Sequence, residues 1–273
     1  MSEQAIRQQR VMSFRLSGTG LKLQLGRLAI GVGFCLLWWA AVRFGLISAF
    51  HVSTPDAVAL YLVQAVPGEL VPHIGATLAA MLSAFVLSAV LGIAGGLVLV
   101  ELPYLRRLLD PYLTGFNSMP RIALAPIFIL WFGIGSPSKI ALALSLGFFI
   151  VLNSTIAGVR NIDPMLLRLS RTLGCSPAER FWKITLPWAL PTVFAGLKLA
   201  LIYSFLGVVT SEMIASKSGL GYMVMYYSGI FRIDAVLGIL FVMAIVAILL
   251  TTVADFIEHR LVGHWTESIN LRG

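Results

Sequence analysis

The sequence predicts an all-α, polytopic membrane protein with about six transmembrane helices. Of the 273 residues, 58% are hydrophobic and only 12% are charged, and the mean hydropathy is +0.90. Soluble domains carry charge on about a quarter of their residues, so a water-soluble fold is not expected. Several apolar runs reach the roughly 20 residues that a helix needs to cross a bilayer. None of them alternates as a membrane β-strand does, so the spanning elements are predicted to be helices.

Six apolar runs are predicted to span the membrane, and the chain divides around them. The runs cover residues 28–47, 74–100, 113–134, 140–159, 192–214 and 235–254. They define a transmembrane domain over residues 28–257, which lies between an N-terminal tail of residues 1–27 and a C-terminal tail of residues 258–273.

The distribution of Lys and Arg predicts which loops face the cytoplasm. Basic residues cluster before the first run, whereas the stretch between the first and second runs contains no Lys or Arg. Cytoplasmic loops are enriched in Lys and Arg, so both termini are predicted to be cytoplasmic. The same pattern places Arg121 on the cytoplasmic side and Lys139 on the outer side, and Lys198 is expected to reach the interface from near a span end. Because sidedness explains the net charge of +8, no nucleic-acid partner is predicted.

The second run is preceded by a helix start and contains a repeat of small residues. Thr54 as N-cap and Pro55 in the first turn predict a short surface helix. The small residues recur every four positions, at Ala84, Ser88, Gly92 and Gly96. Such a stripe permits close approach between helices, either within the chain, which is the favoured interpretation, or at a dimer seam.

The third run is interrupted. Its unbroken apolar part, residues 122–134, is too short to cross alone, and the run contains Pro120 and Pro126. Irregular helix at membrane depth must be buried in protein or line an aqueous cavity. The run is therefore predicted either to belong to a transport pathway or to be an ordinary kinked helix whose freed carbonyls are satisfied by neighbours.

The loop between the fourth and fifth runs, at about residues 160–190, predicts two short helices in series. In the first, Asp163 is the N-cap candidate, Pro164 opens the helix and Gly174 ends it. This helix is amphipathic and therefore needs an apolar partner, either lipid or another protein.

The second short helix has a complete start signal. Ser176 to Glu179 form a capping box with a proline in the first turn. Pro187 and Pro191 are expected to terminate the helix.

These residues resemble a known motif. Gly174, nine intervening residues and Ile184-Thr185-Leu186-Pro187 resemble the EAA loop of binding-protein-dependent ABC importer permeases. The resemblance extends over most of the chain, through Pro120, Ala123-Leu124-Ala125-Pro126, Trp131-Phe132-Gly133-Ile134-Gly135, Gly196-Leu197-Lys198, Val208-Val209, Glu212 and Gly219-Leu220-Gly221. It is most similar to the nitrate, sulfonate, taurine and bicarbonate branch. There is one departure: Arg168-Leu169-Ser170 stands where the family has Glu-Ala-Ala, so a salt bridge made by that acid cannot form unchanged.

The resemblance implies a type I ABC importer permease fold in a bacterial inner membrane. It implies uptake of a small solute, most consistently an anion such as a sulfonate, taurine, nitrate or bicarbonate, delivered by an external binding protein. The implied partners are a second copy of the chain, two ATPase subunits, the binding protein and the lipid bilayer. The two short helices are then coupling helices, and the residues implied to contact the ATPase are Arg168, Arg171, Gly174, Ser176, Glu179, Phe181, Ile184, Leu186 and Pro187.

The chain itself is not expected to be an enzyme. It has no G-x-x-x-x-G-K-[ST] phosphate loop, so ATP and Mg are expected on the partner ATPase, and neither a cofactor nor a metal is expected on this chain. The residues predicted to line the pathway are Asn117, Ser118, Ser145, Asn153, Ser154, Ser204, Thr210 and Ser211. For each Ser and Thr, the alternative is a hydrogen bond to a carbonyl of its own helix. Glu212 is predicted to gate or brace the outer loop, because its negative charge does not suit an anion.

Two other functions are open alternatives at this point. A secondary transporter driven by an ion gradient needs ionisable groups at span centres, and the sequence places none there. An intramembrane enzyme needs clustered His or paired acids, but the four His are scattered. Asp255 and Glu258, at the end of the sixth run, are expected in a solvated exit turn.

Overall fold

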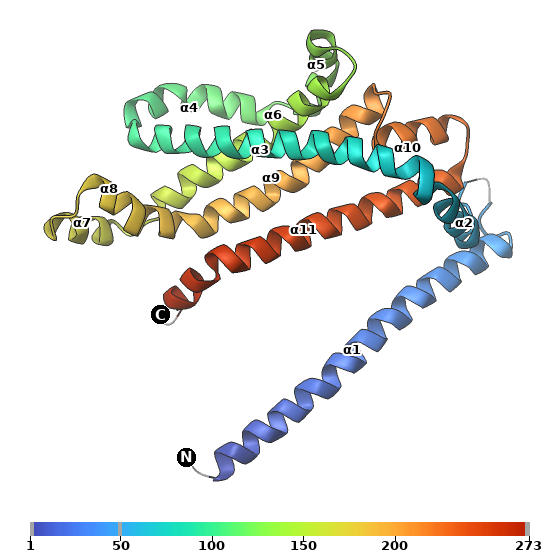
Figure 1. Ribbon diagram of the computed structural model, residues 1–273, viewed down its shortest axis with the longest axis horizontal. Helices are drawn as coiled ribbons and strands as arrows, with labels where there is room; N and C mark the ends of the chain where they lie inside the picture. Colours follow the sequence, from blue (N-terminus) through green and yellow to red (C-terminus); the bar gives the residue numbers. More distant parts are fainter. Residues whose placement is uncertain (1–2, 49–50, 271–273) are drawn as a thin grey trace.

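The computed structural model describes residues 3–48 and 51–270, and the side chains of residues 23–48 and 51–261. Every regular element in these ranges is a helix, which confirms the all-α prediction (Figure 1). The long helices are α1 (Glu3–Arg43), α3 (Val71–Glu101), α6 (Ser136–Arg160), α9 (Leu186–Ile214) and α11 (Ile233–Asn270).

Five helical segments of the described chain are long and apolar enough to span a membrane. They are Leu23–Arg43, Pro55–Glu101, Ser136–Arg160, Pro177–Ile214 and Ile233–Leu261. A sixth span results if the bent pair Pro103–Ser118 and Arg121–Phe132 counts as one. The predicted number of about six spans is thus confirmed with a broken third span.

The third span is broken at a proline. Helix α4 (Pro103–Ser118) ends, and after Met119-Pro120 the chain continues as the 3₁₀ turn η2 (Arg121–Leu124) and helix α5 (Ala125–Phe132), bent by 86°. Met119 is extended, with ψ 136°, because the ring of a following proline excludes the helical conformation. The interruption predicted for the run over residues 113–134 is therefore present, and two helices meet at an angle there.

The helix before the second span begins as predicted. Helix α2 (Pro55–Ala65) follows an extended Thr54, although the Thr54 side chain makes no capping bond. The π-turn η1 (Val66–Leu70) then leads into α3.

Helices α3, α6 and α9 pack side by side, and short helices lie at both ends of this bundle (Figure 1). Helices α7 (Pro164–Thr172) and α8 (Pro177–Arg180) lie at one end, and α2 and α10 (Leu220–Gly229) lie at the other. Helix α11 runs along α9. Helix α1 diverges from the bundle and meets it near its C-terminal end, where Trp38 stacks on Phe241 with 6.3 Å between ring centroids.

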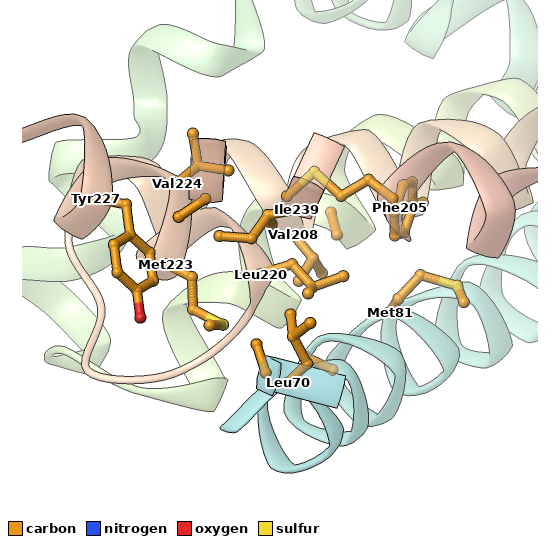
Figure 2. Close-up of a cluster of buried hydrophobic side chains, with 14 of the residues drawn as sticks. Leu70, Met81, Phe205, Val208, Leu220, Met223, Val224, Tyr227 and Ile239 are labelled. Atoms are coloured by element: carbon orange, nitrogen blue, oxygen red, sulfur yellow. The ribbon is translucent and has the colours of Figure 1, made fainter. Parts of the chain in front are cut away.

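A hydrophobic cluster fills the end of the bundle near α10. Leu70, Met81, Val208, Leu220 and Ile239 come from five different elements and are all fully buried (Figure 2). The cluster packs α10 against α3, α9 and α11.

The small-residue stripe of α3 packs inside the chain, as favoured from the sequence. A Cβ added at Gly92 would lie 2.7 Å from Val151 Cβ, and one added at Gly96 would lie 2.6 Å from Thr155 Cβ. Val151 and Thr155 belong to α6, so the stripe is the contact surface between α3 and α6.

Gly96→Ala is expected to destabilise the fold by about 1–3 kcal/mol, because the added methyl overpacks the contact between α3 and α6. Gly75→Ala in the same helix is the matched control, since a Cβ there meets nothing within 4 Å. Unfolding midpoints in detergent, followed by tryptophan fluorescence, should fall for Gly96→Ala alone. Equal midpoints for the two variants would show that α3 and α6 accommodate the added methyl group without loss of stability.

Candidate functional site

The first helix of the connecting loop is bounded as the sequence predicts. Asp163 Oδ1 accepts a hydrogen bond of 2.7 Å from the Met165 amide and caps α7. At the other end Gly174 has φ +74°, and the amides of Gly174 and Cys175 bond back to the carbonyls of Arg171 and Ser170 at 3.0 Å. These two bonds form a Schellman motif, which turns the chain sharply after α7.

The second helix begins as predicted but does not end as predicted. In the capping box, Ser176 Oγ accepts from the Glu179 amide at 3.2 Å and the Ser176 amide donates to Glu179 Oε2 at 3.0 Å. Helix α8 then continues through the π-turn η3 (Phe181–Thr185) directly into α9. The prediction that Pro187 and Pro191 terminate this helix is wrong. Pro187 directly follows the π-turn, in which the Leu186 amide bonds to the Phe181 carbonyl, and Pro191 is accommodated inside α9.

The two helices carry exposed apolar side chains on a basic loop. Met165 and Leu169 of α7 and Leu173, its C-cap, are 74%, 54% and 71% exposed, and Trp182 of η3 is 66% exposed. The predicted coupling residues divide between this surface and the bundle. The exposed ones are Arg168, Arg171, Gly174, Ser176 and Glu179, the partly buried ones are Phe181, Ile184 and Leu186, and Pro187 is buried.

The four exposed apolar side chains were not among the predicted contact residues. Their sequence signal is the amphipathic spacing of α7 and the Phe181-Trp182 pair after the capping box. An exposed apolar surface of this kind is typical of a site that binds another protein.

Glu212 is the centre of a buried polar cluster near the opposite end of α9. Its carboxylate accepts hydrogen bonds from Thr77 Oγ1 at 2.9 and 3.0 Å, from the Gly221 amide at 3.0 Å and from Lys139 Nζ at 3.1 Å. The side chains of Lys139 and Glu212 are 3% and 0% exposed, so this ion pair is dry. One carboxylate on α9 thus connects α3, α6 and α10.

The turn that closes over Glu212 requires glycine. Gly219 has φ +111°, and a Cβ at Gly219 would overlap the Glu212 carboxylate. Lys139 also donates to the Ser218 carbonyl at 2.7 Å. The role predicted for Glu212, to gate or brace the outer loop, stays a prediction. The sequence analysis missed its contact with Lys139, because nothing in the sequence pairs a lysine of one span with an acid 73 residues later.

Most of the predicted pathway residues are not brought together. Ser118, Ser145 and Thr210 donate to carbonyls of their own helices at 2.7–2.9 Å, as the alternative interpretation holds. Ser154 packs against Gly196 of α9, and Asn153 is exposed on α6. The remaining two, Ser204 and Ser211, are buried among helices.

Asn117, the last of the predicted pathway residues, lines a pocket of about 390 Å³ at the break in the third span. The walls come from α6 and α9, and Arg121 of η2 lies beside Asn117. The Arg121 guanidinium is 4.4 Å from the centroid of the Phe149 ring, and its Nη1 donates to the Leu146 carbonyl at 3.3 Å. Arg121 was expected on the cytoplasmic side from the distribution of Lys and Arg, but it lies beside residues midway along α6.

Lys198 joins two helices. It forms ion pairs with Asp255 and, at 2.8 Å, with Glu258 of α11. These three side chains connect α9 to α11. The turn expected at Asp255 and Glu258 is absent, because α11 continues as a helix to Asn270.

The chain is similar to known components of membrane transport systems. A family described as "Binding-protein-dependent transport system inner membrane component" matches residues 88–265. The taurine transport system permease protein TauC of Escherichia coli is 31% identical over 88% of both chains. The putative aliphatic sulfonates transport permease protein SsuC of Bacillus subtilis is 31% identical over 85% of this chain and 84% of its own.

Other relatives are named for other solutes. The riboflavin transport system permease protein RibX of Chloroflexus aurantiacus is 29% identical over 85% of this chain and 87% of its own. Among solved structures, the inward-facing MetNI methionine ABC transporter matches with a TM-score of 0.61 and 22% identity, over 69% of this chain and 94% of that chain. This likeness concerns the fold.

Proposed function

Since the chain belongs to the binding-protein-dependent transport system inner membrane component family, it is the permease subunit of an ABC importer, and we propose that it imports a small sulfonate anion. The substrate class rests on the two relatives named for taurine and aliphatic sulfonates. Family membership also implies an ATPase and a solute-binding protein as partners.

The exposed apolar surface of α7 and η3 carries the proposal for energy coupling. Met165, Leu169, Leu173 and Trp182 are exposed on a loop that also carries Arg168 and Arg171. Exposed apolar surface of this kind marks a site of interaction with a protein or a membrane, and the ABC importer family supplies an ATPase as the protein partner. In this proposal the ATPase seats on this surface, binds ATP and Mg, and performs the hydrolysis, while the permease binds no cofactor.

The continuity of α8, η3 and α9 supports a direct mechanical link between the ATPase-binding loop and the membrane-spanning helix α9. No break separates the capping box at Ser176 from the helix that reaches Glu212. A displacement of the loop by the ATPase therefore moves α9 as a whole. Glu212, at the far end of α9, acts as the brace that keeps α3, α6 and the turn at Gly219 attached during this movement.

The remaining features of the proposal concern assembly and orientation. The importer contains two copies of this chain, two ATPases and one external binding protein. The loop of α7 and α8 and both termini face the cytoplasm of a bacterium, in agreement with the clustering of Lys and Arg in these segments.

Uptake by the reconstituted complex tests the proposal. Proteoliposomes containing the permease and its ATPase, with binding protein outside and ATP inside, are expected to accumulate radiolabelled taurine. Uptake should stop with a non-hydrolysable ATP analogue and persist when ionophores collapse the membrane potential. Accumulation that needs an ion gradient and no ATP would instead identify a secondary transporter.

A further inference from the structure

Arg121 carries a positive charge that no acid neutralises among the side chains the structure describes. It forms no ion pair with any described carboxylate. Its guanidinium makes hydrogen bonds to the Leu146 carbonyl and to Asn117 Oδ1, both uncharged groups. Of the five N–H donors of an arginine, these bonds use two. The buried Nε has no acceptor among the described atoms.

The depth of Arg121 makes this unpaired charge unusual. The Leu146 carbonyl and the Phe149 ring belong to the middle of α6, which runs from Ser136 to Arg160. On the other wall of the pocket, Leu199 and Tyr203 lie in the middle of α9. A charge midway along membrane-spanning helices is costly, and such groups usually serve a transported ligand or a charge partner.

The break in the third span gives the charge access to a pocket. Because α4 ends at Ser118 and α5 turns away by 86°, η2 presents Arg121 to a space of about 390 Å³. Broken helices at membrane depth are tolerated where they are buried in protein or line a cavity, and ligand sites of transporters are commonly built at such breaks. The volume lies in the range of small-molecule sites.

We propose that Arg121 binds the anionic group of the transported solute in this pocket. The inference rests on the proposed function and adds to it a site within the permease. The guanidinium supplies donors for a sulfonate or carboxylate, and Asn117 and Phe149 hold it in place. Leu146, Ile150 and Leu199 supply an apolar wall that suits the short aliphatic part of such an anion.

The chemistry of arginine separates this role from ion-gradient coupling. A coupling group has to release and regain a proton, whereas a guanidinium stays protonated in proteins. The pocket therefore offers a permanent positive charge for an anion and no proton relay.

Substitution of Arg121 tests the proposal in proteoliposomes that contain the permease, its ATPase and its binding protein. Arg121→Gln is expected to lower ATP-driven taurine uptake about tenfold or more, because a charge-assisted hydrogen bond is lost. Arg121→Lys should recover part of the uptake, since it keeps the charge without the planar fork. Arg107→Gln, an exposed arginine of α4, is the control and should transport as the wild type does.

A second pair of variants leaves Arg121 in place. Ile150→Glu puts a carboxylate on the pocket wall as a competitor for the guanidinium, and Ile150→Gln is its uncharged counterpart. Taurine uptake by Ile150→Glu should be about tenfold or more below that of Ile150→Gln, because the new carboxylate forms an ion pair with the Arg121 guanidinium. This comparison holds even if Arg121→Gln fails to assemble.

The outcomes distinguish failure of the proposed Arg121 site from failure of the proposed function. Uptake of taurine by Arg121→Gln within about twofold of the wild type, or equal uptake by the two Ile150 variants, overturns the site while the importer stands. Wild-type complexes that import neutral riboflavin and no sulfonate, nitrate or bicarbonate overturn both the anionic substrate and the site.

Discussion

Lys139→Met should lower the stability of the permease by about 3–5 kcal/mol, because it leaves the Glu212 carboxylate buried without a cation. The Glu212 side chain is 0% exposed and accepts hydrogen bonds from Thr77 and the Gly221 amide as well as from Lys139. Without Lys139 the carboxylate must take up a proton or open the contact with the turn at Gly219. The unfolding midpoint of the purified protein in detergent, followed by tryptophan fluorescence, measures the loss.

Two further variants test the explanation. Lys217→Met removes an exposed lysine from the same end of the bundle and should leave the midpoint unchanged. Lys139→Met combined with Glu212→Met removes both charges, and this double variant should be more stable than Lys139→Met alone. If the double variant were the less stable of the two, an uncompensated charge would not be the cause.

Gly174→Val should abolish binding of the ATPase while the permease still inserts into the membrane. A Cβ at Gly174 meets nothing within 4 Å, so the substitution adds no clash. The cost arises from the backbone, because φ is +74° and a β-branched residue in the left-handed region is strained by about 1–3 kcal/mol. The strain is relieved by opening the Schellman motif, which displaces α7 from α8 and divides the apolar surface between them.

Gly174→Asn is the matched control for this variant, since Asn tolerates the left-handed conformation better than other residues with a Cβ. Co-purification of the tagged ATPase with the permease should be close to normal for Asn and lost for Val. Membrane fractionation should show equal amounts of both variants. Normal co-purification with Gly174→Val would mean that the geometry of this turn is not required for docking.

The local features of the loop were predictable because each depends on neighbouring residues. The cap at Asp163, the capping box at Ser176 and the left-handed glycine at position 174 all form between residues a few positions apart. The end of the second helix was not predictable in this way. Pro187 and Pro191 are local stop signals, but a π-turn and the packing of α9 in the bundle override them.

The pathway residues stay a prediction for a related reason. A serine or threonine in an apolar run either faces a cavity or bonds to its own helix, and the sequence cannot show which face of the helix is covered. In the structure Ser145 and Thr210 bond to their own helices, whereas Arg121, which was attributed to charge sidedness, faces the pocket.

The sequence by itself determined the all-α membrane fold, the number of spans and the form of the loop of α7 and α8, because hydropathy, capping and turn conformation are properties of contiguous residues. Only the tertiary structure decided that Lys139 pairs with Glu212, that Lys198 joins α9 to α11, and where along α6 the charge of Arg121 lies. These arrangements depend on which helix faces are in contact. The energy of a buried charge depends on groups that only folding brings within a few ångströms of it.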